Sequence, residues 1–207
     1  MEKENSKKIL GGEHIKQTKL ATGEYVTIFA MELEEGQKID KATQVEAFKR
    51  YEELEKFRGW LISETNTIEK FIELVLTNSL FPKEDKIRRN LFNEFILSQR
   101  FFTLWEKRSL LRGILKSELL LERLTIDRQT LKEFRTKFQE LIERRNEFGH
   151  NPILIKVPSL VPIMRCTKNG KENDVELTAE LLDKIKQIQK DVLSTTMELN
   201  KQINESS

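Results

Sequence analysis

The chain has 207 residues, enough for one domain with an appendage or for two small domains, and we expect one domain. Hydrophobic residues make up 38% of the sequence and charged residues 34%, so the apolar content suffices for a core and argues against a fully disordered chain. The low counts of 8 Gly and 4 Pro argue against a turn-rich sandwich or barrel.

The cysteine content and the lack of a long apolar run bear on the cellular location of the protein. The single cysteine, Cys166, excludes a disulfide framework within one chain and a cysteine-rich zinc site. The sequence has no apolar run of about 18 residues, so we expect no transmembrane helix and no membrane partner. Residues 1–8 lack the apolar segment of a signal peptide. We therefore expect a cytoplasmic protein.

The net charge of +2 hides an uneven distribution. Residues 83–145 contain 16 Lys and Arg against 10 Asp and Glu, whereas the rest of the chain contains 20 against 24. A basic middle third suits a phosphate-bearing partner. The alternative is that the basic excess is spread over solvated helix faces, and charge alone favours this alternative.

Residues 1–40 differ from the rest of the chain. Residues 24–31 form a β-prone run that follows Gly23. Because one strand needs a partner, this run would pack on the main domain or on another subunit. We therefore predict an N-terminal extension over residues 1–40 and a helical domain over residues 41–207.

The first helical pattern begins near residue 40 and ends before Pro82, which disfavours a helical conformation for the residue ahead of it. Asp40 or Thr43 is the candidate N-cap. Gly59 leaves open whether this stretch is one long helix or two. Residues at a 3-4 spacing form one apolar stripe, namely Leu61, Thr65, Ile68, Ile72 and Val75.

Two further helices and a short one are predicted next. The first covers residues 84–98, with an apolar face formed by Ile87, Leu91, Phe92 and Phe95. The second begins near Thr103, because Thr103 and Glu106 have the spacing of a capping box. A short helix is predicted over residues 118–124.

The fourth main helix is predicted over residues 127–148. Its apolar stripe consists of Leu131, Phe134, Phe138 and Leu141. The next two stripe positions are Arg145 and Phe148, so an arginine stands where the pattern asks for an apolar residue. Positions that break a local rule are often functional. Gly149 suits a helix C-terminus, and Pro152 prevents continuation.

The last third of the chain predicts a hairpin and a final helix. Residues 161–166 and 174–177 flank the turn pair Asn169-Gly170. Thr178 then caps a helix that runs to about Asn200. Its apolar stripe consists of Leu181, Ile185, Ile188 and Val192. The predicted fold is all-α, a helical bundle with a small β-hairpin before the last helix.

Three polar residues lie at the end of the fourth helix. Asn146 and His150 are four residues apart and share a helix face, and Arg145 lies about a quarter turn from Asn146. A histidine can remove or donate a proton near neutral pH, and an arginine can hold a phosphate and offset developing charge. Asn146 could orient either group. These residue types suit metal-independent cleavage of RNA, in which the 2′-hydroxyl attacks the adjacent phosphate.

The number of histidines in the chain bears on this hypothesis. The reaction needs an acid and a base, and the only other histidine is His14 in the N-terminal extension. A symmetric dimer would bring together two copies of His150 and Arg145. The alternative is structural: His150 complements the helix dipole, and the arginines pair with surface glutamates. Spacing alone favours the structural alternative.

Residues 145–150, Arg-Asn-Glu-Phe-Gly-His, resemble the Arg-polar-x(3)-His signature of HEPN-domain ribonucleases. As in that family, the motif closes a long amphipathic helix late in a helical chain, and a further helix follows. Residues 101–111 also resemble the aromatic-plus-lysine segment of some stand-alone members. The resemblance covers roughly residues 45–200.

The resemblance implies a HEPN-like helical bundle that dimerises and forms a composite ribonuclease site between two motif helices. Many members are prokaryotic toxins or phage-defence effectors that cut RNA without a metal or cofactor and leave a 2′,3′-cyclic phosphate. Transferred residue by residue, Arg145, Asn146 and His150 are the catalytic candidates. The implied partners are RNA, a second copy of the chain, and a cognate antitoxin or nucleotidyltransferase-like protein. The alternative is a non-catalytic HEPN-like dimer that serves as a protein-interaction or nucleotide-binding module.

Other cations are candidates for contact with the RNA backbone, namely Lys107, Arg108, Arg112 and Arg144. For the first three, the alternative of a solvated helix face is favoured. Aromatic residues interleave with them, namely Phe101, Phe102 and Trp105. Such residues are more typical of a core than of a base-stacking platform.

Overall fold

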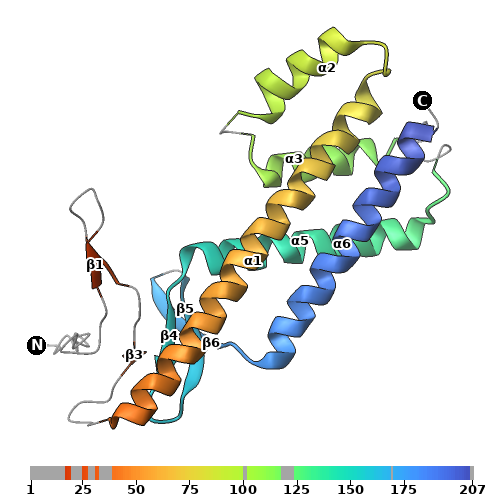
Figure 1. Cartoon of the computed structure of the whole chain (residues 1–207). Helices are drawn as coiled ribbons and strands as arrows, with labels where there is room; N and C mark the ends of the chain where they lie inside the picture. The colour runs from red at the N-terminus through yellow and green to blue at the C-terminus, as the bar shows by residue number, and fades with distance from the viewer. Residues whose placement is uncertain are drawn as a thin grey trace, which may run out of the picture. The chain divides into compact units, whose positions relative to one another are not determined.

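The structure is a computed structural model that describes residues 17–19, 25–27, 31–32, 39–99, 102–117, 124–168 and 170–205 (Figure 1). The described helices are α1 (Lys41–Leu80), α2 (Lys86–Phe92), the π-helical turn η1 (Asn93–Leu97), α3 (Leu104–Ile114), α5 (Arg128–His150) and α6 (Ala179–Glu205). The described strands are β1 (Gln17–Lys19), β2 (Tyr25–Thr27), β3 (Met31–Glu32), β4 (Ile153–Lys156), β5 (Val161–Lys168) and β6 (Lys171–Glu176). The prediction of a mostly helical chain with a β-hairpin before the last helix is confirmed, and strand β4 extends the hairpin to three antiparallel strands.

The backbone divides into two units, each built from two separate segments of the sequence. Unit 1 contains Met1–Gly59 and Glu147–Ala179, and unit 2 contains Trp60–Asn146 and Glu180–Ser207. The division therefore falls inside α1 and inside α5. The predicted boundary between an extension over residues 1–40 and a bundle over residues 41–207 stays a prediction, because most of residues 1–40 lie outside the described part of the chain.

Helix α1 is one continuous helix of 40 residues, so Gly59 does not interrupt it. It begins after Asp40, whose Oδ1 accepts a hydrogen bond from the backbone amide of Thr43 at 2.7 Å, as an N-cap does. It ends two residues before Pro82, as the sequence predicts. The whole predicted stripe from Leu61 to Val75 is buried.

Unit 2 is a helical bundle whose core comes from the predicted stripes. Helix α5 buries Leu131, Phe134, Phe138 and Leu141, and α6 buries Ile185, Ile188 and Val192. Polar contacts join the helices at the rim of this core. Lys184 of α6 pairs with Glu140 of α5 at 2.7 Å, and Gln189 of α6 donates to Glu64 of α1 at 2.9 Å. Apolar burial of this kind contributes most of the stability of such a bundle.

The segment that follows α1 differs from its prediction. Helix α2 is shorter than expected and continues as η1, so the predicted single helix over residues 84–98 is broken by a π-turn. Its apolar face is largely open to solvent: the exposed fraction is 75% for Ile87, 49% for Leu91 and 61% for Phe95. Periodicity identifies such a face but does not state what covers it. The predicted helix over 118–124 lies almost entirely outside the described residues.

Unit 1 contains a four-stranded sheet in the order β3-β4-β5-β6. Strands β4, β5 and β6 pair antiparallel, and Met31 of β3 pairs with Ile155 of β4 in parallel. The predicted hairpin is confirmed, with longer strands than expected, and Gly170 has a φ of 72° that suits the predicted tight turn. Strand β4 was not predicted.

The β-prone run over residues 24–31 finds its partners within the chain. The part of this run in β2 pairs antiparallel with β1, and Met31 belongs to β3. Of the two predicted alternatives, the main domain or another subunit, the pairing of Met31 with Ile155 agrees with the first. Separately, among the described helices none combines the length and the apolar character that crossing a membrane requires.

Candidate functional site

Helix α5 carries the three candidate catalytic residues at its C-terminal end. The helix starts after Asp127, whose Oδ1 accepts the backbone amide of Thr130 at 2.9 Å. Its last turn is intact, because the amide of Asn151 donates to the carbonyl of Glu147 at 3.0 Å. Asn146 and His150 are therefore i,i+4 neighbours on one helix surface, as the spacing predicts.

The side chains of this helix end are accessible and partly ordered by one another. His150 and Asn146 are exposed, and Arg145 is half-buried. Arg145 donates from Nη1 to Oδ1 of Asn146 at 3.0 Å. This bond orients the guanidinium and leaves its other N–H groups available to a phosphate. The described geometry thus presents a cation, an amide and an imidazole along one helix end.

A residue that sequence reasoning missed lies beside this turn. Arg58 of α1 donates from Nη2 to the backbone carbonyl of Asn151 at 2.9 Å. The ring of Phe57, its neighbour in sequence, lies 5.3 Å from the ring of Phe148, which is fully buried. The sequence gives no local signal for Arg58, because its partner is distant along the chain.

Lys107 does not belong to an open surface. Only 3% of this residue is exposed, and its Nζ lies 2.5 Å from Oε1 of Glu69 and 2.7 Å from Oε1 of Glu73. Desolvation lowers the pKa of Lys107, but the hydrogen bonds and charges of the two glutamates outweigh it and raise this pKa above its ordinary value. The favoured prediction of a solvated helix face is therefore wrong for Lys107, because two carboxylates from α1 hold its ammonium group inside unit 2.

Arg108 and Arg112 of α3 are more exposed to solvent than Lys107. Arg112 is exposed, whereas Arg108 is half-buried and donates to Oε1 of Gln139 on α5 at 2.7 Å. The guanidinium of Arg108 also lies 4.8 Å from the ring centre of Trp105. Burial and the charge of Arg112 lower the pKa of Arg108. Arg108 therefore places positive charge beside α5 within unit 2.

Two remaining expectations concern Arg144 and the aromatic residues near α3. Arg144 is half-buried on α5. Trp105 is 44% exposed, so the expectation of a core position is wrong for this residue. Phe102 is half-buried, and Phe101 lies outside the described residues.

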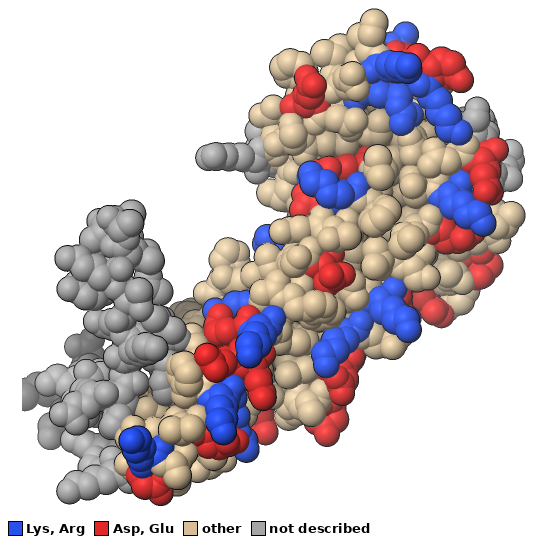
Figure 2. All heavy atoms as spheres, in the orientation of Figure 1, with Lys and Arg blue, Asp and Glu red and all other residues tan. Residues whose placement is uncertain are grey.

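Figure 2 shows several groups of Lys and Arg side chains beside Asp and Glu, separated by wide areas of other residues. Among the described residues, ion pairs such as Lys137 with Asp191, at 2.7 Å, compensate part of the positive charge. On the face in view, the Lys and Arg side chains therefore do not form one continuous surface.

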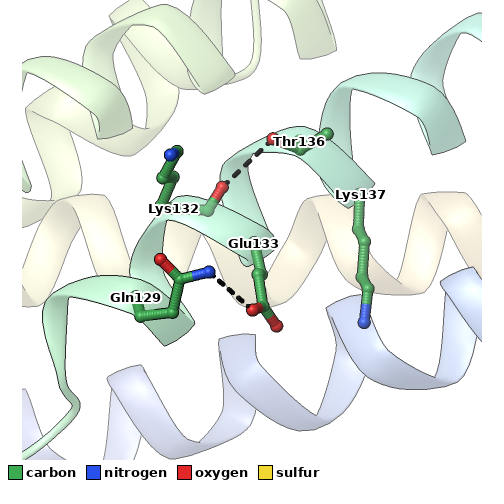
Figure 3. A pocket seen from close by; sticks show the side chains of 5 residues that line it. All are labelled: Gln129, Lys132, Glu133, Thr136 and Lys137. Atoms are coloured by element: carbon green, nitrogen blue, oxygen red, sulfur yellow. Dashed lines mark hydrogen bonds between the residues drawn. The ribbon is translucent and has the colours of Figure 1, made fainter.

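A shallow hollow of about 200 Å³ lies on α5, well before its C-terminal end (Figure 3). Its lining is Gln129, Lys132, Glu133, Thr136 and Lys137. Most of the polar side chains are already engaged: Gln129 donates to Glu133 at 2.8 Å, and Lys137 points toward α6, where it pairs with Asp191. The hollow therefore offers few unsatisfied groups to a ligand.

Neither a metal site in the described part of the chain nor a known relative points to a function. Among the described residues, no cluster of three or more His, Cys, Asp or Glu side chains is arranged to hold a metal ion. Comparisons of the chain with models of protein families, with curated proteins and with solved structures found no match. The case for a function therefore depends on the residues of α5 and their surroundings.

Proposed function

We propose that the protein is a metal-independent endoribonuclease with a HEPN-like fold, in which Arg145, Asn146 and His150 carry out the chemistry. The observation that carries this proposal is the intact last turn of α5, which keeps Asn146 and His150 on one surface with the guanidinium of Arg145 bonded to the amide. The resemblance of residues 145–150 to the HEPN signature supports it.

The reaction follows from the roles these groups can take. The 2′-oxygen of RNA attacks the adjacent phosphorus, and the bond from phosphorus to the 5′-oxygen breaks. One imidazole removes the 2′-hydroxyl proton, and a second imidazole donates a proton to the departing 5′-oxygen. Arg145 stabilises the charge that develops on the phosphate oxygens, and Asn146 orients Arg145. The products are a 2′,3′-cyclic phosphate and a 5′-hydroxyl.

The need for two imidazoles supports a homodimer. Each chain contributes one His150, so a composite site between two α5 helix ends supplies an acid and a base. The resemblance extends the proposal to a biological role, a toxin or phage-defence effector in the cytoplasm. Its partner would be a cognate antitoxin or a nucleotidyltransferase-like protein.

The test is RNA cleavage in the presence of a metal chelator. The wild type should cleave, and His150→Ala and Arg145→Ala should each lose at least about 100-fold in rate, the scale expected for an acid–base group or a charge-stabilising donor. Arg128→Ala is the matched control, because Arg128 is an exposed arginine at the other end of the same helix. Cleavage that requires magnesium, or that persists in both site variants, contradicts the proposal.

A second candidate function is a non-catalytic interaction module. The favouring observation is the open apolar face of α2 and η1, where Ile87, Leu91 and Phe95 are about half exposed or more. An exposed contiguous apolar face of this kind often marks a protein contact.

Light scattering of the purified chain tests whether this face mediates self-association, and RNA cleavage by the same samples separates the module from the ribonuclease. If the face mediates self-association, the double variant Ile87→Asp with Phe95→Asp should reduce the measured mass to that of one chain. Met197→Asp, at an exposed apolar position of α6, should leave the mass unchanged. An interaction module also predicts no RNA turnover and no effect of His150→Ala.

A further inference from the structure

The C-terminal end of α5 receives a cation from another helix of the same unit. Nη2 of Arg58 donates to the carbonyl oxygen of Asn151 at 2.9 Å, and Asn151 directly follows His150. The last carbonyls of a helix lack partners within the helix, and a positive charge there also complements the helix dipole. Arg58 therefore acts where the turn that carries His150 is otherwise most free to unwind.

Arg58 is itself held in place along α1. Its Nη1 lies 3.0 Å from Oε1 of Glu55, and the Arg58 side chain is only 23% exposed. Burial, together with the charge of Glu55 and a hydrogen bond to it, raises the pKa of Tyr51 to about 12. Tyr51, Glu55 and Arg58 thus form a series of contacts on one face of α1, and these contacts restrict the rotamers of Arg58.

Local contacts support the same turn. The backbone amide of Asn151 donates to the carbonyl of Glu147 at 3.0 Å, and the side-chain amide of Asn151 donates to the same oxygen at 2.9 Å. Phe148 packs against Phe57. All of these residues belong to unit 1.

We infer that Arg58 is a positioning residue, which fixes the last turn of α5 and thereby the position of His150. Its catalytic consequence rests on the proposed ribonuclease function. Arg58 does not contact the reacting atoms in this role, because it acts through the carbonyl of Asn151. Small displacements of a catalytic group reduce the rate strongly, so holding this turn matters more for turnover than for RNA binding.

Arg50 provides a matched control on the same helix. It also donates to a backbone carbonyl of unit 1, that of Leu160, at 2.9 Å, and it also pairs with a glutamate of α1, Glu46, at 3.3 Å. Arg50→Ala therefore removes the same kinds of contact as Arg58→Ala without touching the end of α5. Urea unfolding of both variants measures the loss of global stability, so that local effects can be separated from it.

The first readout is hydrogen exchange of the Asn151 backbone amide, which reports on the last turn directly. Arg58→Ala should accelerate this exchange about tenfold or more, as expected for loss of a hydrogen bond from a charged donor. Arg50→Ala should leave it unchanged, and Arg58→Lys should restore part of the protection. Unchanged exchange in Arg58→Ala, or equal acceleration in both alanine variants, overturns the inference whether or not the protein cleaves RNA.

The second readout is RNA cleavage. Arg58→Ala should lower kcat by about 10- to 100-fold and change KM by less than about twofold, whereas Arg50→Ala should change neither. Faster exchange with a normal kcat would contradict the positioning role. A wild type that does not cleave RNA would refute the proposed function, and the exchange measurement would still decide whether Arg58 fixes the turn.

Discussion

The ammonium group of Lys107 lies between the carboxylates of Glu69 and Glu73, with only 3% of the residue exposed. Because folding raises the pKa of Lys107, the stability that this group contributes is complete below its ordinary pKa near 10.5. That contribution is lost only as the pH rises through the higher folded value. At neutral pH the cluster therefore joins α3 to α1 at full strength.

Lys107→Ala should reduce the free energy of unfolding by about 3 kcal/mol, because it leaves two carboxylates facing one another without their cation. Lys70→Ala is the matched control. Lys70 also pairs with Glu73, at 3.1 Å, but its side chain is 76% exposed. Its removal should cost less than about 0.5 kcal/mol. Equal losses for the two variants in urea unfolding would show that burial does not set the strength of this cluster.

Asp174 makes the stability of the sheet in unit 1 depend on pH in the acidic range. A hydrogen bond from Arg165, assisted by Lys156, lowers the pKa of Asp174 to about 2. The stability it contributes is therefore present above its ordinary pKa of 3.8 and is lost as the pH falls through about 2. Between pH 5 and pH 2, the free energy of unfolding of Asp174→Asn should fall by about 1 kcal/mol less than that of the wild type. The difference is this small because solvent screens the pair. Urea midpoints measured from pH 5 to pH 2 that fall equally in both proteins would contradict this account.

Among the elements, α5 shows how a sequence pattern and a functional site coincide. Its buried stripe fixes which face points into unit 2, and Arg145 occupies a stripe position only one turn from the helix end. Gly149 lies inside the last helical turn, and a Cβ built on it would meet nothing within 4 Å. Gly170 differs, because its φ of 72° is one that side chains disfavour.

Gly149→Ala should therefore stabilise the protein by about 0.5 to 1 kcal/mol, because alanine loses less backbone entropy than glycine on forming a helix. Gly170→Ala should instead destabilise it by about 1 kcal/mol, because its turn needs the left-handed region. Thermal unfolding of both variants checks the pair. A loss of stability in Gly149→Ala would show that this residue does not belong to the helix.

The ends of α1 and the start of α3 were predictable because each depends on local signals. Asp40 as an N-cap, the box of Thr103 with Glu106, and Pro82 as a stop act within a few residues of the helix ends. Strand β4 follows Pro152 directly and has only four residues, so no run of alternation could reveal it. The open face of α2 was not predictable, since periodicity does not report what packs against a face.

The residues of the candidate site also fall into two groups, those that a local pattern predicts and those that depend on distant partners. The spacing of Arg145, Asn146 and His150 is a property of one helix, so the sequence alone places them on its end. Arg58 and the burial of Lys107 depend on partners far along the chain, namely Asn151 for the first and the glutamates of α1 for the second. Such pairings arise only from the fold, and no local pattern reports them.

For the whole molecule, the proposed mechanism requires two chains, because one His150 cannot serve as both acid and base in a single event. RNA cleavage per chain should therefore fall when the protein is diluted below the dimer dissociation constant. A ribonuclease active as a monomer would instead keep a constant rate per chain. Light scattering at the same concentrations identifies the dissociation range.

The central claim is that a 2′-hydroxyl of RNA is the nucleophile at a site built on His150. The most direct measurement compares end-labelled single-stranded RNA with the same RNA methylated at every 2′-oxygen, both incubated with the wild type in a chelator. We expect the unmodified RNA to be cut to 2′,3′-cyclic phosphate ends, and the methylated RNA to stay intact, as should unmodified RNA with His150→Ala. Cleavage of the methylated RNA, or 3′-hydroxyl ends on the products, would contradict the mechanism.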